Sequence, residues 1–312
     1  VNAMPWLRAL AATMAALGFP LASALAAASA AGAAATTASP ISVRDDRGTE
    51  HRLAAPAQRI VSMLPSLTEI VGDLQSRAGG ESRLVGVDRH SDWPASVERL
   101  PRTGDMDAVA VETIVALRPD VVLASTSSRG LDRLESLGVR VVRLKSDQHA
   151  DVARALDTVA RLMGEPAAGA LAWASIQQQL DDAASRLPMA WRGRTVYLEI
   201  GAGPYAAGSR SFIGETLARM GLVNIVGAGL GPFPRLNPEF VLQAAPDLVI
   251  GARREVDTMS QRPGWHALKA LREGRRCALP PADYERLIRP GPRLGEAART
   301  LADCIAALPP PR

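Results

Sequence analysis

The chain has 312 residues, of which 47% are hydrophobic and 4% aromatic, and its net charge is +4 at pH 7. This length is enough for about two domains with cores built mainly from Ala, Val, Leu and Ile. The basic residues are scattered and form no Lys/Arg block with interleaved aromatic residues, which argues against nucleic-acid binding.

Residues 1–28 have the layout of a secretory signal peptide. One positive charge at Arg8 precedes an apolar run over residues 9–28, and small residues at 22–26 offer A-x-A cleavage sites. A membrane anchor is the alternative, because the run approaches the length of a spanning helix. Its alanine content and Pro20 favour cleavage. We therefore expect a periplasmic protein, with residues 29–57 forming a leader and a first strand.

The cysteines and histidines suggest no metal site and no resident cofactor. Cys277 and Cys304 can form one disulfide in an oxidising compartment, or both can be small buried apolar residues, and the sequence favours neither alternative. The histidines are far apart and form no pair with metal-ligand spacing: His51, His90, His149 and His266.

Predicted strands and helices alternate over residues 58–148. Ser66 is predicted to be the N-cap of the first helix, with Glu69 as its capping-box partner. Continuous apolar strands that alternate with helices indicate a parallel sheet covered on both faces. The predicted strands are 59–63, 84–87, 120–124 and 139–142, and the predicted helices are 67–75, 111–117 and 131–137.

Residues 149–187 interrupt this alternation with a long helical pattern, which predicts a rigid connector between two domains. The alternation resumes over residues 188–312, beginning with a strand at 195–200 and a helix at 212–220. The sequence therefore predicts an N-terminal α/β lobe (58–148), a helical connector (149–187) and a C-terminal α/β lobe (188–312).

One sequence phrase occurs once in each predicted lobe. Residues 112–123 and 239–250 both contain Glu, a short helical segment, Pro-Asp and a buried strand. Pro-Asp is a good helix terminator, which explains each copy alone but explains the shared Glu and the matched spacing less well. The repetition indicates duplicated lobes, and two such lobes form a ligand cleft at their strand ends.

Several motifs match one protein family when they are taken in their order along the chain, namely Arg59–Ser62, Pro65–Glu69, Leu84–Val87, Ser91–Pro94, both Pro-Asp phrases, Glu135–Gly138 and Arg289–Arg293. Together they resemble the periplasmic binding proteins of ABC importers for vitamin B12, haem and iron–siderophores, and most of all the vitamin B12 binders. The resemblance implies two Rossmann-like lobes with parallel sheets, joined by a long helix with little hinge motion. It also implies a monomeric, non-enzymatic protein that binds a small molecule between its lobes and docks onto membrane subunits of an ABC transporter.

Ten residues in the predicted cleft loops are candidate ligand contacts. Tyr205 and Phe233 fall where the vitamin B12 binders place aromatic walls. Asp105 falls where several haem binders carry a tyrosine iron ligand, and Ser125 replaces a tryptophan common in the vitamin B12 binders. His90 is either an axial ligand or a hydrogen-bonding loop histidine. The ten are Pro65, Ser66, His90, Trp93, Asp105, Ser125, Tyr205, Phe233, Glu285 and Arg289.

Two carboxylates are candidates for transporter docking. Glu239 falls where the family places the docking glutamate of the C-terminal lobe, and the alternative is a first-turn glutamate favoured by the helix dipole. The position in the N-terminal lobe aligns near Ser128, where Asp132 or Glu135 can substitute, and Glu135 is the residue we predict.

The expected ligand is cobalamin or a related corrinoid, held by apolar and aromatic walls and a few polar contacts. Haem or a ferric siderophore is the alternative, and Arg89, Arg210 and Arg289 could contact an anionic siderophore. An exported α/β enzyme is a remote alternative, because the sequence has no G-x-S-x-G elbow, P-loop or HExxH motif.

Overall fold

The computed structural model describes residues 40–201, 203 and 205–311. The predicted signal peptide and most of the predicted leader lie outside these residues. Within the described residues two α/β lobes with mainly parallel sheets follow each other along the chain, which confirms the predicted fold class. None of the described helices is long and apolar enough to cross a membrane.

The N-terminal lobe is built on a parallel sheet in the order β4-β3-β5-β6. A separate antiparallel pair, β1 (Ile41–Arg44) and β2 (Glu50–Leu53), lies against α4. A 3₁₀ turn at Ala95–Arg99 follows β4. The sheet strands are β3 (Ile60–Ser62), β4 (Leu84–Val87), β5 (Val121–Ser125) and β6 (Val141–Leu144). The helices are α1 (Pro65–Ala78), α2 (Val111–Ala116), α3 (Asp132–Ser136) and α4 (His149–Leu162).

The C-terminal lobe repeats this strand order. If the parallel strands of each lobe are numbered along the chain, both sheets have the order 2-1-3-4. In the C-terminal lobe this order is β9-β7-β10-β11, and the short strand β8 pairs antiparallel with β7. The strands are β7 (Thr195–Ile200), β8 (Tyr205–Ala206), β9 (Val223–Asn224), β10 (Leu248–Ala252) and β11 (Arg276–Leu279). The helices are α6 (Phe212–Arg219), α7 (Pro238–Ala244), α8 (Arg253–Thr258), α9 (Lys269–Arg272), α10 (Pro281–Leu287) and α11 (Leu294–Ala306). The 3₁₀ turns are Met189–Trp191, Ala228–Leu230, Met259–Gln261 and Trp265–Ala267.

The repeated phrase forms the same structure twice, as α2–β5 and as α7–β10. The residue before each proline has a positive φ, 46° at Arg118 and 44° at Ala245. The aspartate that follows the proline then binds the start of the neighbouring strand. Asp120 accepts the backbone N–H groups of residues 58 and 59 at 2.7 and 2.8 Å. Asp247 accepts the backbone N–H and the hydroxyl of Thr195, both at 3.0 Å.

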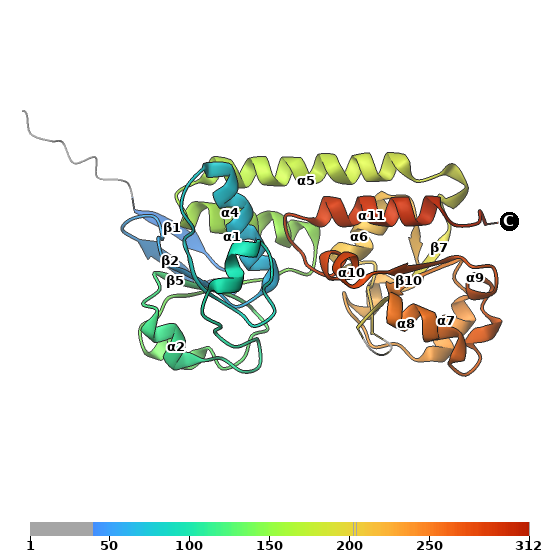
Figure 1. Cartoon of the computed structure of the whole chain (residues 1–312), viewed down its shortest axis with the longest axis horizontal. Helices are drawn as coiled ribbons and strands as arrows, with labels where there is room; N and C mark the ends of the chain where they lie inside the picture. Colours follow the sequence, from blue (N-terminus) through green and yellow to red (C-terminus); the bar gives the residue numbers. More distant parts are fainter. Residues whose placement is uncertain (1–39, 202, 204, 312) are drawn as a thin grey trace, which may run out of the picture. The chain divides into compact units, whose positions relative to one another are not determined.

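The connection between the lobes is α5 (Pro166–Arg186), a helix of 21 residues that is about 30 Å long. It runs along both lobes and packs on α4 and α11 (Figure 1). One apolar cluster includes α1 and α4 of the N-terminal lobe, α5, and α6, α10 and α11 of the C-terminal lobe. On the opposite face each lobe has a cluster of its own, under α2 and α3 in one lobe and under α7 and α8 in the other. The lobes therefore share part of their core.

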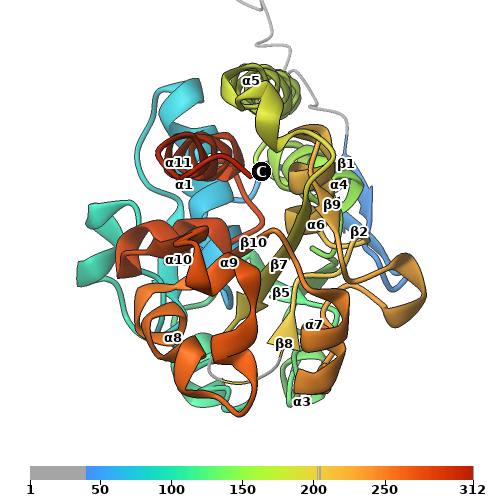
Figure 2. The same cartoon turned by 90° about the vertical axis from the view of Figure 1, so that its right-hand side faces the viewer.

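Figure 2 shows this layering from the end of the C-terminal lobe, with α5 and α11 above β7 and β10 and with α7 and α8 below these two strands. Strand alternation places the two clusters on the two faces, because Val196 and Leu198 face the shared cluster and Tyr197 faces the other. A disulfide between Cys277 and Cys304 joins β11 to α11, which decides between the two alternatives that the sequence left open.

The predicted cap of α1 is wrong. The helix begins at Pro65, its N-cap is Leu64, and no side chain caps it. Proline suits the first helical position because its φ is already helical and its missing N–H has no helical partner to lose. Ser66 therefore lies inside the first turn, and the buried carboxylate of Glu69 binds arginines of the C-terminal lobe instead of the helix end.

Candidate functional site

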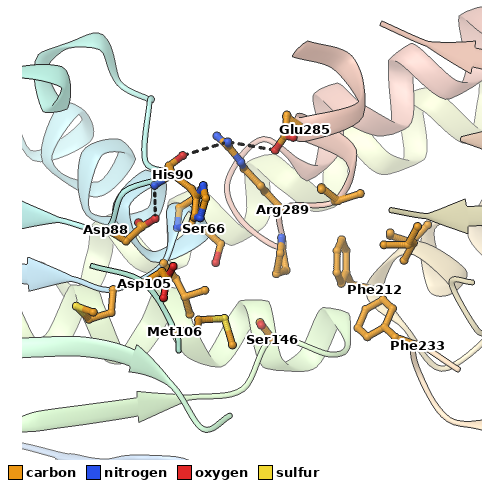
Figure 3. A pocket seen from close by; sticks show the side chains of 17 residues that line it. Ser66, Asp88, His90, Asp105, Met106, Ser146, Phe212, Phe233, Glu285 and Arg289 are labelled. Carbon is orange, nitrogen blue, oxygen red and sulfur yellow. Dashed lines mark hydrogen bonds and ion pairs between the residues drawn. The ribbon is translucent and has the colours of Figure 1, made fainter. Parts of the chain in front are cut away.

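A cavity of about 430 Å³ lies between the carboxyl ends of the strands of the two lobes, and we call it the interlobe cavity (Figure 3). The N-terminal lobe lines it with Met63, Leu64, Pro65, Ser66, Asp88, His90, Asp105, Met106 and Ser146. The C-terminal lobe lines it with Ile200, Phe212, Ile213, Phe233, Glu285, Ile288, Arg289 and Pro290.

The N-terminal wall carries two carboxylates in different environments. Asp88 follows β4 and is 1% exposed. Burial raises its pKa, although its carboxylate accepts hydrogen bonds from the Ser91 hydroxyl and from the backbone N–H of His90. The backbone N–H groups of residues 108 and 107 lower the pKa of Asp105, and Arg89 pairs with Asp105 at 3.0 Å.

The C-terminal wall is mainly apolar and supplies both aromatic rings. Phe212 begins α6 behind the capping residue Ser211, whose hydroxyl accepts the backbone N–H of Gly214. The rings of Phe212 and Phe233 meet edge to face, with their centroids 6.0 Å apart. Figure 3 shows both rings beside the cavity. Their apolar faces suit a ligand with an extended flat surface.

At the rim, Arg289 joins the two lobes through carboxylates. Its Nη1 donates to Glu69 Oε1 at 3.1 Å and to Asp92 Oδ1 at 2.5 Å, and its Nη2 donates to Glu285 Oε2 at 3.3 Å. Arg293 also binds Glu69, with Nε 2.9 Å from Oε2. We call Glu69, Asp92, Glu285, Arg289 and Arg293 the Arg289 cluster.

Seven of the ten predicted contact residues line the interlobe cavity, namely Pro65, Ser66, His90, Asp105, Phe233, Glu285 and Arg289. Among the described lining residues, Trp93, Ser125 and Tyr205 do not appear. Trp93 lies under Arg293, whose guanidinium carbon is 4.9 Å from the ring centroid. Ser125 is buried at the end of β5, with its Oγ 2.8 Å from that of Ser127. Tyr205 is 48% exposed on β8.

Sequence reasoning missed several cavity residues, among them Asp88, Ser146 and Phe212. A positional signal was present for two of them. Asp88 directly follows β4, and Ser146 lies two residues after the end of β6, where parallel sheets bind ligands. Phe212 had no such signal, because it lies at the start of a helix.

The predicted docking carboxylates lie away from the interlobe cavity. Glu239 is exposed in the first turn of α7. Glu135 lies on α3, where it and Asp132 bind the buried guanidinium of Arg143 at 3.0 and 3.2 Å. Ser128, at the aligned family position, is buried.

Among residues 40–201, 203 and 205–311, no group of three potential metal-ligating side chains comes together. His90 and Met106 both line the interlobe cavity, and each is a residue type that can bind a haem iron as an axial ligand.

Residues 60–282 match the sequence profile of the periplasmic binding proteins. The match spans more than half of the chain, so the chain belongs to this family, and the resemblance predicted from its motifs is confirmed. The lobes and the cavity between them agree with this class of solute-binding protein.

Three comparisons give the finer similarities. The vitamin B12-binding protein of Yersinia pestis is 28% identical over 213 residues, covering 66% of this chain and 74% of the relative. An uncharacterised substrate-binding lipoprotein of an ABC transporter in Bacillus subtilis, YvrC, is 25% identical over 281 residues, covering 86% and 87%. A periplasmic heme-binding protein of Pseudomonas aeruginosa superposes with a TM-score of 0.68 at 28% identity, covering 81% and 95%.

Proposed function

We propose that this protein is a periplasmic solute-binding protein that captures cobalamin or a related corrinoid in the interlobe cavity and delivers it to an ABC transporter. Membership of the periplasmic binding protein family supports the roles of capture and delivery. The lining of the cavity supports the choice of ligand: an apolar wall with two phenylalanine rings faces a wall rich in hydrogen-bond acceptors. A corrinoid combines a flat ring system with a rim of uncharged amides that donate hydrogen bonds.

The charges in the lining also favour an uncharged ligand. Asp88, Asp105 and Glu285 contribute three carboxylates, and Arg289 contributes the one guanidinium among the described lining residues. Amide N–H groups can donate to such carboxylates, whereas an anionic ligand would meet like charge. The cavity volume of about 430 Å³ is typical of small-molecule sites. A complete corrinoid is larger, so part of it would remain outside.

Haem is a second candidate, favoured by one specific observation. His90 and Met106 lie in the same lining, where either could coordinate an iron at the centre of a flat ring. The two carboxylates of haem are less compatible with the charges of this cavity.

The experiment is a titration of the purified protein with cyanocobalamin and, in parallel, with hemin, followed by calorimetry and by the visible spectrum. We expect saturable binding of cyanocobalamin that is tighter than that of hemin. Phe233→Ala should weaken cyanocobalamin binding by roughly tenfold or more, because it removes a cavity wall. The matched variant Tyr205→Ala changes an exposed aromatic outside the cavity and should leave affinity within about twofold.

Absence of cyanocobalamin binding would refute the corrinoid assignment. A hemin spectrum that loses its axial-ligand bands in His90→Ala would establish the second candidate in its place.

A further inference from the structure

Arg289 is surrounded by carboxylates from both lobes. Both of its Nη atoms donate to carboxylates: Nη1 to Glu69 and Asp92, and Nη2 to Asp92 and Glu285, at distances between 2.5 and 3.4 Å. Nη2 also lies 3.5 Å from the backbone oxygen of His90. A guanidinium has five N–H donors, so little of its hydrogen-bonding capacity remains for a ligand.

The three carboxylates differ in their exposure. The side chain of Glu69 is 1% exposed and is shared with Arg293. The side chains of Asp92 and Glu285 are 63% and 49% exposed. Asp92 comes from the loop after β4, and Glu285 from α10 one helical turn before Arg289. Glu69 therefore belongs to the interior of the protein, whereas Asp92 and Glu285 approach Arg289 from solvent.

The charges of the Arg289 cluster are not balanced. Two guanidiniums meet three carboxylates, so the cluster is negative by one charge with all groups ionised. The hydrogen bond from Arg289 lowers the pKa of Asp92, against the effect of its burial. Burial acts to lower the pKa of Arg289. Its hydrogen bonds to Asp92 and Glu69 outweigh this effect and raise the pKa above its ordinary value. Asp92 and Arg289 therefore stay charged near neutral pH.

We infer that Asp92 and Glu285 are specificity-determining residues, which occupy Arg289 so that the interlobe cavity discriminates against ligands carrying carboxylates. The inference rests on the proposed function, because it concerns which macrocycles that cavity accepts. A ligand carboxylate reaching Arg289 must displace Asp92 or Glu285 and then lie close to the displaced negative charge. An uncharged amide avoids this repulsion.

These ion pairs also connect the lobes, so a purely structural role has to be separated from selectivity. If the ion pairs are only structural, their loss would lower thermal stability and weaken the binding of all ligands alike. If they keep ligand carboxylates away from Arg289, their loss would strengthen the binding only of ligands that carry carboxylates. A matched pair of ligands with and without carboxylates distinguishes the two roles.

The experiment compares Asp92→Asn and Glu285→Gln with the wild-type protein, using hemin, hemin dimethyl ester and cyanocobalamin as probes. Both substitutions keep the side-chain shape and remove one charge. We expect hemin to bind roughly three- to tenfold tighter in each variant, with the ester within about twofold of wild type in both. Cyanocobalamin affinity should stay within about twofold in Asp92→Asn, because Asp92 lies outside the cavity lining. The controls are Glu296→Gln and Asp157→Asn. Their side chains are 45% and 52% exposed and pair with arginines outside the cavity lining.

An unchanged ratio of hemin to ester affinity in both cluster variants would overturn the shielding role, even if cyanocobalamin binds the wild type well. An equal gain in the control variants would also overturn it, because net charge alone would then be the cause. If the wild type fails to bind cyanocobalamin, but the cluster variants bind hemin more tightly and its dimethyl ester as before, the shielding role stands and the corrinoid assignment is wrong.

Discussion

Asp88 and Asp105 line the same cavity, but their surroundings move their pKa values in opposite directions. Burial raises the pKa of Asp88. Two backbone N–H groups lower the pKa of Asp105, and the charge of Arg89 acts in the same direction. The ionised form of Asp88 therefore costs stability in the folded protein, whereas that of Asp105 contributes stability.

We expect Asp88→Asn to raise the melting temperature at pH 7. The folded-state pKa of Asp88 lies above its unfolded value, so ionised Asp88 disfavours folding, and this cost disappears as the pH falls to about 4 and below. The advantage of the variant should shrink over the same range. Scanning calorimetry at several pH values measures the difference.

Asp105→Asn is the matched comparison, with the opposite sign. Its stabilising effect in the wild type is present above the unfolded pKa and is lost as the pH falls through the lower folded pKa. The variant should therefore melt at the same or a lower temperature at pH 7. A lower melting temperature for Asp88→Asn than for Asp105→Asn at pH 7 would contradict this account.

At the scale of elements, the Pro-Asp phrase has the same function in each lobe. Asp120 and Asp247 each accept two hydrogen bonds at the start of the neighbouring strand. These contacts fix β3 next to β5 and β7 next to β10. Asp120 therefore stabilises the pairing of β3 with β5, and Asp247 stabilises the pairing of β7 with β10.

Asp120→Ala and Asp247→Ala should each lower the free energy of unfolding by about 1–3 kcal/mol, because backbone donors lose their acceptor. Urea unfolding followed by circular dichroism measures the loss. Asp257→Ala, at an exposed aspartate of α8, is the control and should change the free energy by less than about 0.5 kcal/mol. A loss confined to one of the two lobes would argue against equivalent roles.

Local sequence patterns predicted most elements but not how their ends are satisfied. The predicted strand 120–124 corresponds to β5 (Val121–Ser125), and the predicted helix 111–117 to α2 (Val111–Ala116). The cap of α1 was wrong because the partners of Glu69 are Arg289 and Arg293, more than 200 residues away. A contact between residues so far apart in the sequence leaves no local sequence pattern from which it could be predicted.

At the scale of the whole described chain, the lobes share an apolar cluster along α5. The sequence predicted the long helix but not the shared core, because the period of a helix shows which face is apolar and not what covers it. The same limit applies to the site. Loop position predicted seven cavity residues, whereas Phe212 lines the cavity from the first residue of a helix, a position that loop-based prediction does not cover.

The delivery step of the proposed function depends on the exposed surface rather than on the cavity. We expect Glu239→Arg to abolish transporter-dependent uptake and leave ligand affinity unchanged, because it reverses an exposed charge on α7, away from the cavity lining. Uptake in cells and calorimetry on the purified variant measure the two effects.

Glu112→Arg is the matched control, since Glu112 occupies the equivalent first-turn position of α2 in the N-terminal lobe and is also exposed. Its uptake should remain close to that of the wild type. Normal uptake by Glu239→Arg, or an equal loss in both variants, would refute a specific docking role for Glu239.

The two walls of the interlobe cavity have different chemistry, although the lobes share one topology. Both aromatic rings come from the C-terminal lobe, and Asp88, Asp105 and both serines come from the N-terminal lobe. A planar ligand with two different faces would then bind in one orientation between these walls, and not in the orientation turned over by 180°. A ligand bound in one orientation would always present the same face to the transporter that receives it.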